Sequence, residues 1–233
     1  MNQVITTATR PGCAVNTLTG ATDRTWKLLA CGVAAAPLFI GMSVIQAFTR
    51  EGFDLKRHAL SMLSLGDYGW IQIANFLISG CLTVLCAIGM RRALHRGRGG
   101  TWGPVLVGMF GAGTLAAGLF STDPAMGFPP GAPAGLPETL SWHGVLHGVA
   151  FFVAFASLVA SCFVYARRFA ERKQWQWTAY CVISGVAAPA LVAMGVASPT
   201  SAGMPFLLAG AVAFAWLAVL AMELLAERSL RSA

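Results

Sequence analysis

Six long apolar stretches divide the 233-residue chain, and short polar segments separate them. Each stretch is close to the roughly 20 residues that an α-helix needs to cross a bilayer. The stretches cover residues 27–48, 70–90, 103–121, 142–164, 178–197 and 205–226. This pattern predicts an all-α fold: an integral membrane bundle of six transmembrane helices that occupies residues 26–227.

The polar segments predict the parts outside the bundle. Residues 1–25 have no apolar period, so we expect a disordered N-terminal tail, and residues 228–233 form a short tail after the last span. In the first long loop, the spacing from Asp54 onward predicts a short interfacial helix with Asp54 as its N-terminal cap. The loop at 122–138 is rich in Pro and Gly, and we expect it to cover one end of the bundle.

Composition agrees with a membrane protein. The chain is 56% hydrophobic and only 11% charged, whereas soluble domains carry about 25% charged residues. Of the 16 Lys and Arg, 13 lie in the termini or in the 91–102 and 165–177 loops. In a chain with six spans, these segments all lie on the same side of the membrane. The other three, Arg50, Lys56 and Arg57, lie on the opposite side. Since basic residues favour the cytoplasmic side, we expect both termini in the cytoplasm and no nucleic-acid partner.

Polar residues recur at one depth of the predicted bundle. With that orientation, the outer half of the first span carries Ser43, Gln46 and Arg50. The outer half of the second span carries Gln72, Asn75 and Ser79, and both sets have helical spacing. Because polar groups in hydrocarbon are costly unless they face the bundle interior or water, these stripes favour a shared, outward-facing cavity. The alternative is that each group only bonds a neighbouring helix.

His143 and His147 stand four residues apart at the outer end of the fourth span, on one helix face. Together with Asp123 and His58 from the outer loops, they are the candidate catalytic residues, because imidazoles and carboxylates exchange protons near neutral pH. The candidate binding residues are Arg50, Arg57, Asp54, Ser61, Gln46, Gln72 and Asn75. Arg57 would hold an anionic head group, unless the basic residues of this loop only pair with nearby acids or lipid head groups.

The histidine pair also has the spacing of a helical zinc site, for which His58 or Asp123 would supply a third ligand. However, "HGVLH" lacks the glutamate of the HExxH metalloprotease motif. A haem site is disfavoured, because one helix face cannot supply both axial ligands. The sequence therefore requires no cofactor, and a metal, a proton-transferring pair and a structural pair stay open.

A family resemblance rests on three segments. These are "TREGFDLKRHALSMLSLGDYGWIQIANFLISG" at 49–80, "FSTDP" at 120–124 and "HGVLHG" at 143–148. With them, the chain resembles the six-span bacterial and archaeal membrane proteins grouped as domain-of-unknown-function family 998. The resemblance implies six helices and a multi-pass protein of the prokaryotic inner or plasma membrane, and it implies no established activity.

Three classes of function remain at this point. One is a membrane-embedded enzyme that acts on a lipid or isoprenoid-like substrate through acid–base or metal-assisted chemistry of the histidines. Another is a non-catalytic accessory or sensor protein. A small-solute transporter is less favoured, because the two halves share no repeated motif. The sequence leaves the oligomeric state open.

Overall fold

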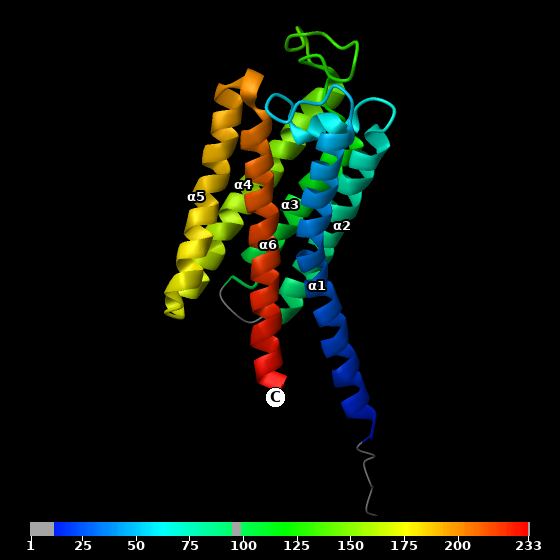
Figure 1. Ribbon diagram of the computed structural model, residues 1–233. Helices are drawn as coiled ribbons and strands as arrows, with labels where there is room; N and C mark the ends of the chain where they lie inside the picture. Colours follow the sequence, from blue (N-terminus) through cyan, green and yellow to red (C-terminus); the bar gives the residue numbers. More distant parts are fainter. Residues whose placement is uncertain (1–11, 95–98, 233) are drawn as a thin grey trace, which may run out of the picture.

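Six long α-helices and two short 3₁₀ helices make up the computed structural model, which describes residues 12–94 and 99–232 (Figure 1). All six α-helices have the length and apolar composition needed to cross a membrane. No strand occurs in the described residues, so the predicted all-α bundle is confirmed. The long helices are α1 (Gly12–Thr49), α2 (Gly69–Leu94), α3 (Trp102–Leu119), α4 (Trp142–Glu171), α5 (Trp175–Ala197) and α6 (Gly203–Ser232). The short ones are η1 (Leu60–Ser64) and η2 (Pro199–Ser201).

Two helices extend beyond the apolar stretches. α1 already begins at Gly12 and α6 continues to Ser232, so most of the two expected tails is helical, while residues 1–11 lie outside the described part. The physical reason is the cooperativity of the helix. Once an apolar span has nucleated a helix, each added residue gains a hydrogen bond at the cost of fixing only itself.

Each helix packs against the next one along the chain, and α6 returns to pack against α1, so the helices form a closed ring. Small residues let the backbones approach closely, as expected for membrane helices. A side chain on Gly80 of α2 would lie 2.9 Å from the carbonyl oxygen of Gly111 on α3. Gly113 of α3 meets Ala150 and Ala154 of α4 in the same way.

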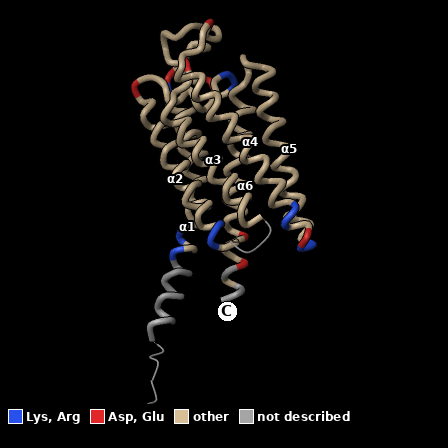
Figure 2. The backbone as a smooth tube through the Cα atoms, turned by 180° about the vertical axis from the view of Figure 1, so that it is seen from behind, with Lys and Arg blue, Asp and Glu red and all other residues tan. Residues whose placement is uncertain are grey.

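The two ends of the bundle differ in charge. We call the end where α1 starts and α6 finishes the basic end, and the end formed by residues 50–68 and 120–141 the loop end. Figure 2 shows most of the described Lys and Arg at the basic end. There Arg172, which follows α4, forms an ion pair of 2.9 Å with Glu227 of α6, and the buried Arg168 of α4 lies 3.9 Å from the same carboxylate.

The half of the bundle near the basic end is densely packed. Tyr165, Trp216 and Phe169 are fully buried there, and Gly103 lets the Tyr165 ring lie directly against the α3 backbone. The indole nitrogen of Trp216 donates to Cys181 at 3.5 Å. The half near the loop end is not filled in this way, and a cavity lies there.

Two loop segments close the loop end. Met62, Ala125, Met126 and Phe128 form a small apolar cluster that joins the first loop to the Pro-rich loop. The short helix expected in the first loop is present, but as the single 3₁₀ helix η1, which starts at Leu60 and not at Asp54. Asp54 instead caps a turn: its carboxylate accepts from the amide of Lys56 at 2.9 Å.

Candidate functional site: an aromatic cavity with a histidine at its polar end

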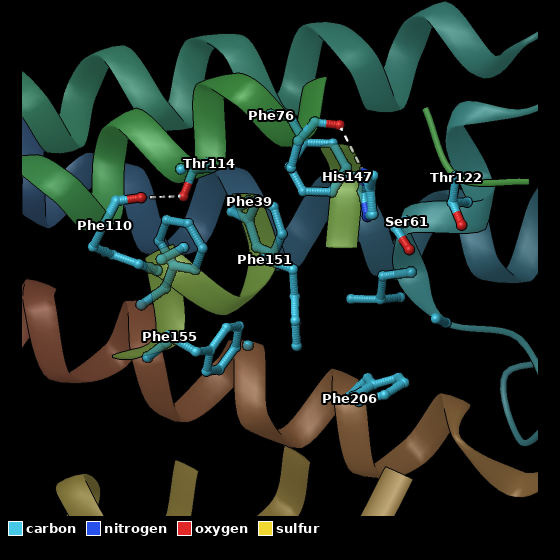
Figure 3. Close-up of a pocket in the computed structure, with 18 of the residues that line it drawn as sticks. Phe39, Ser61, Phe76, Phe110, Thr114, Thr122, His147, Phe151, Phe155 and Phe206 are labelled. Carbon is cyan, nitrogen blue, oxygen red and sulfur yellow. Dashed lines mark hydrogen bonds between the residues drawn. The ribbon is translucent and has the colours of Figure 1, made fainter. Parts of the chain in front are cut away.

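A cavity of about 270 Å³ lies inside the ring of helices, toward the loop end (Figure 3). Helices α1, α2, α3, α4 and α6 line it, together with residues 59–61 before and within η1. Gly210 of α6 lies on its wall, and a side chain there would lie 3.7 Å from the ring of Phe39 of α1. Seven phenylalanines contribute to its wall: Phe39, Phe76, Phe110, Phe151, Phe155, Phe206 and Phe214.

The polar groups of the cavity gather at one end. Figure 3 shows Ser61, Thr122 and His147 together at that end, whereas Phe110 and Phe155 lie toward the other. Thr114 also lines the cavity, but its hydroxyl donates to the carbonyl of Phe110 within its own helix at 2.9 Å. No Asp, Glu, Lys or Arg occurs among the described lining residues. The site is therefore an apolar chamber with an uncharged polar end.

His147 is held in one orientation by the end of α3. Its Nδ1 lies 2.8 Å from the carbonyl oxygen of Phe120 and 3.2 Å from that of Ala117. Because both partners can only accept, Nδ1 carries the hydrogen and donates it. The other ring nitrogen, Nε2, then keeps its lone pair when the ring is neutral. Because the carbonyls at the end of α3 accept the hydrogen bond from Nδ1, Nε2 is the nitrogen that can accept a hydrogen bond from a ligand.

The capped start of α4 fixes the position of His147 along the bundle. Ser141 caps the helix, and its hydroxyl accepts from the amide of Gly144 at 3.0 Å. The Asp123 carboxylate accepts from the amide of Ser141 at 3.0 Å, and Gly144 leaves room for it, since a side chain there would collide with its oxygen. Asp123 thus anchors the start of α4 and does not line the cavity.

His143 does not share the cavity with His147. It lies one helical turn nearer the loop end, with its ring centre 3.7 Å from that of Trp142 and 5.9 Å from that of Phe120. Its Nδ1 is buried without a hydrogen-bond partner in the described structure. Nor do any three His, Cys, Asp or Glu side chains of residues 12–94 and 99–232 group closely enough to hold a metal ion. The zinc hypothesis therefore finds no third ligand in that part of the chain.

His58 is a structural link between the two loops. Its Nδ1 accepts from the amide of Asp54 at 2.8 Å, which leaves the hydrogen on Nε2, 3.1 Å from the carbonyl oxygen of Met126. The ring is only 2% exposed and packs beside Phe53 and Phe128. With both nitrogens occupied, His58 has no lone pair or proton to offer to a ligand.

The basic candidates of the first loop also lie outside the cavity. Arg50 donates to the carbonyl oxygens of Leu63 at 3.1 Å and Leu65 at 2.6 Å, and its guanidinium lies 5.5 Å from the Phe128 ring centre. Burial lowers the pKa of Arg50 from its usual value, and the neighbouring Asp67 opposes that shift. Arg57 is exposed. Ser61 is the one candidate binding residue that reaches the cavity wall.

The polar stripes of α1 and α2 bond each other. Gln46 donates to the side-chain oxygen of Gln72 at 2.7 Å, and Asn75 donates to that oxygen and to Ser43, each at 3.2 Å. These side chains are at most 3% exposed, and none of them lines the cavity. The expectation that the stripes of the first two spans form a shared cavity with the fourth is therefore wrong for these residues, which instead join two helices.

Sequence reasoning missed the aromatic wall of the cavity and Thr122. In a membrane chain, a phenylalanine that faces a cavity and one that faces lipid both stand in apolar sequence, so composition does not separate them. The weak signal was the spacing of Phe151 and Phe155, one turn apart on the helix face that also carries Gly148 and His147.

Comparisons with known proteins identify the family. The chain matches the family described as "Protein of unknown function (DUF998)" over residues 33–223. Neither the curated proteins nor the solved structures gave a match. The matched range runs from the middle of α1 into the second half of α6 and so includes every residue that lines the cavity. The chain belongs to the DUF998 family of multi-pass membrane proteins.

Proposed function

We propose that this protein binds a lipid- or isoprenoid-like molecule inside the helix bundle, with the apolar chain among the phenylalanines and the polar head at His147. The observation that carries the proposal is an aromatic cavity with a single oriented imidazole at its polar end. Sites for small molecules are mostly apolar, with a few placed polar groups that fix orientation. This cavity has that composition.

The chemistry of the polar end defines the head group. Nε2 of His147 accepts a hydrogen bond, and the hydroxyls of Ser61 and Thr122 donate or accept one. A charged head would lie among residues that include no opposite charge, and burying an unpaired charge is very costly. We therefore infer an uncharged head with a hydroxyl or amide group, and not a phosphate.

The ligand enters from the bilayer beside Gly148. This residue lines the cavity and is itself exposed, and nothing lies within 4 Å of where its side chain would start. A gap in the wall next to His147 lets the head reach the polar end while the chain follows it from the membrane. The absence of a side chain at Gly148 is thus part of the site.

A second candidate is catalysis at the same site, with His147 as general base. The carbonyls of Phe120 and Ala117 fix its tautomer, and they would also stabilise the imidazolium that forms when Nε2 takes a proton. The proton would come from the hydroxyl of the bound head or from Ser61. This version belongs to the enzyme class, whereas binding alone fits an accessory or sensor protein.

Binding of monooleoylglycerol to the purified protein in detergent tests the proposal. We expect His147→Phe, which keeps a ring of similar size but removes the acceptor, to weaken binding about tenfold, the usual effect of losing one buried hydrogen bond. His143→Phe is the matched control on the same helix and should bind like the wild type. No binding by the wild type, or equal binding by both variants, would overturn the proposal.

Chemical conversion of the bound molecule separates the two candidates. His147→Gln keeps a hydrogen-bonding side chain but cannot act as a base near neutral pH. If the protein is an enzyme, this variant should retain binding and lose turnover of the lipid, detected by mass spectrometry of the products. If the wild type releases the lipid unchanged, the catalytic version is excluded for that lipid.

A further inference from the structure

A second hollow lies directly beside the cavity, on the outer surface of the bundle. It is a groove of about 720 Å³ between α4 and α5, and its walls are apolar throughout. On α4 it is lined by Phe152, Ala156 and Val159, and on α5 by residues such as Pro189, Ala193 and Val196. In a membrane protein, a groove of this kind faces the hydrocarbon of the bilayer.

The groove arises because α4 and α5 diverge. The two helices pack tightly at the middle of α5, where a side chain on Gly185 would lie 3.0 Å from Cβ of Cys162. From there they separate toward the loop end, as Figure 1 shows. α6 lies behind the gap, and the ring of Phe206 packs against Gly195 of α5.

A wall one side chain thick separates the groove from the cavity. Phe151 and Phe155 line both spaces. Their ring centres are 4.6 Å apart, and Phe151 also meets Phe206 of α6 edge-on at 5.7 Å. The two spaces therefore run side by side along α4, with only phenylalanine rings between them.

The opening at Gly148 adjoins the groove, because Gly148 lies one helical turn from Phe152, which lines the groove. Gly148, Phe152, Ala156 and Val159 follow one another at helical spacing on α4, so the exposed face that begins at the opening continues into the groove. When the head of a molecule lies at His147, one residue before Gly148, both spaces extend from it toward the basic end. One space is inside the wall and one is outside it.

We infer that the ligand is a two-chained, uncharged lipid of the diacylglycerol type, which straddles the wall of Phe151 and Phe155. One chain lies in the central cavity and the other in the α4–α5 groove, while the head reaches His147 through the opening at Gly148. This inference rests on the proposed function and adds the number of chains. A single-chained isoprenoid would leave the groove to bulk lipid.

Two lipids that differ by one chain provide the test. The purified full-length protein is titrated with dioleoylglycerol and with monooleoylglycerol in the same detergent. The second chain buries apolar surface against the groove, so we expect dioleoylglycerol to bind at least about tenfold more tightly. Equal affinity for the two lipids would overturn the inference.

Filling the groove checks where the second chain lies. Ala193→Trp on α5 and Ala156→Trp on α4 each fill the groove from one side without lining the cavity. Both variants should lose the advantage of dioleoylglycerol and keep the affinity for monooleoylglycerol, and that retained affinity shows that each is folded. Ala190→Trp, an exposed residue of α5 outside the groove, is the control and should keep both affinities.

The outcomes separate this inference from the proposed function. If neither lipid binds the wild type, both fail. If monooleoylglycerol binds in a His147-dependent way while the groove variants leave dioleoylglycerol unaffected, the proposed function stands and the two-chain inference is wrong. In that case the lipid in the groove belongs to the bilayer and not to the ligand.

Discussion

His147 and His58 show how the same residue type takes two roles within one bundle end. In both rings one nitrogen is fixed by a backbone group: the α3 carbonyls hold His147, and the Asp54 amide holds His58. The difference is the second nitrogen. In His58 it donates to Met126 across the loops, whereas in His147 it remains for the cavity. The neighbouring backbone, and not the spacing of histidines, decides which of them is a candidate for ligand contact.

Replacement of His58 tests its structural role. His58→Phe keeps the contacts with Phe53 and Phe128 but leaves the Asp54 amide and the Met126 carbonyl without their partner. We expect a loss of about 2 kcal/mol, since each buried group left unsatisfied costs about 1–3 kcal/mol. The apparent melting temperature in detergent should then fall by several degrees. His143→Phe breaks no hydrogen bond of the described structure, and a melting temperature equally low in that control would contradict the assignment.

Residue-level expectations were limited by what a single helix pattern contains. The spacing of Gln46, Gln72 and Asn75 correctly indicated one face of each helix, but periodicity does not say which neighbour that face meets. The same limit applies to His143 and His147. A spacing of four residues places both histidines on one helix face, yet the cavity ends between them. The position of that end depends on α3 and the loops.

At the scale of elements, the polar contact between α1 and α2 is a hydrogen-bonded network that stabilises the pair of helices. Gln72 is its centre, because it joins Ser43, Gln46 and Asn75 and has no exposed surface. Such contacts between membrane helices contribute about 0.6–2 kcal/mol each. The network therefore positions Phe39 and Phe76, which stand on the same two helices and line the cavity.

Gln72→Leu and Thr83→Val form a matched pair for this network. Both positions are buried on α2, but the Thr83 hydroxyl donates only to Ser79 in its own helix at 2.8 Å. We expect Gln72→Leu to cost at least about 1 kcal/mol and Thr83→Val to be nearly neutral. Thermal unfolding in detergent measures both. A neutral Gln72→Leu would mean that the network contributes nothing to the association of α1 and α2.

The spans themselves were predictable because the bilayer imposes both their length and their composition. Five of the six predicted stretches lie within helices of the structure, and the third, 103–121, ends two residues beyond α3. The sequence predicted that the short helix starts at Asp54, whereas η1 starts at Leu60. The reason is that the turn at Asp54 has the two features of a helix start, a carboxylate that caps the backbone and apolar residues at helical spacing. Tertiary contacts with the Pro-rich loop, which end that turn at His58, are not encoded in local spacing.

For the whole molecule, the distribution of charge predicts how the bundle lies in the membrane. Of the 16 Lys and Arg in the sequence, 13 fall in the termini or in the 91–102 and 165–177 loops, and those among them that the structure describes lie at the basic end. From the preference of basic residues for the cytoplasm, we predict that the basic end faces the cytoplasm and that the cavity opens in the outer half of the membrane. The structure's separation of a basic end from a loop end is consistent with this orientation.

Reporter fusions test the orientation in a bacterial host. A fluorescent protein that matures only in the cytoplasm, fused after Ala233, should fluoresce. Alkaline phosphatase, which folds only outside, should be active when fused after Gly135 in the Pro-rich loop. The reverse pattern of activities would place the loop end in the cytoplasm and contradict the predicted orientation.

Photo-crosslinking can determine whether the apolar chain of the ligand lies inside the bundle. A monooleoylglycerol analogue with a diazirine at the end of its chain is bound and irradiated, and the labelled residues are identified by peptide mass spectrometry. We expect labelling of Phe110, which lines the cavity away from its polar end, or of Phe214, whose ring centre lies 5.3 Å from that of Phe110. Labelling confined to residues on the outer surface, such as Phe48 and Phe163, would contradict it.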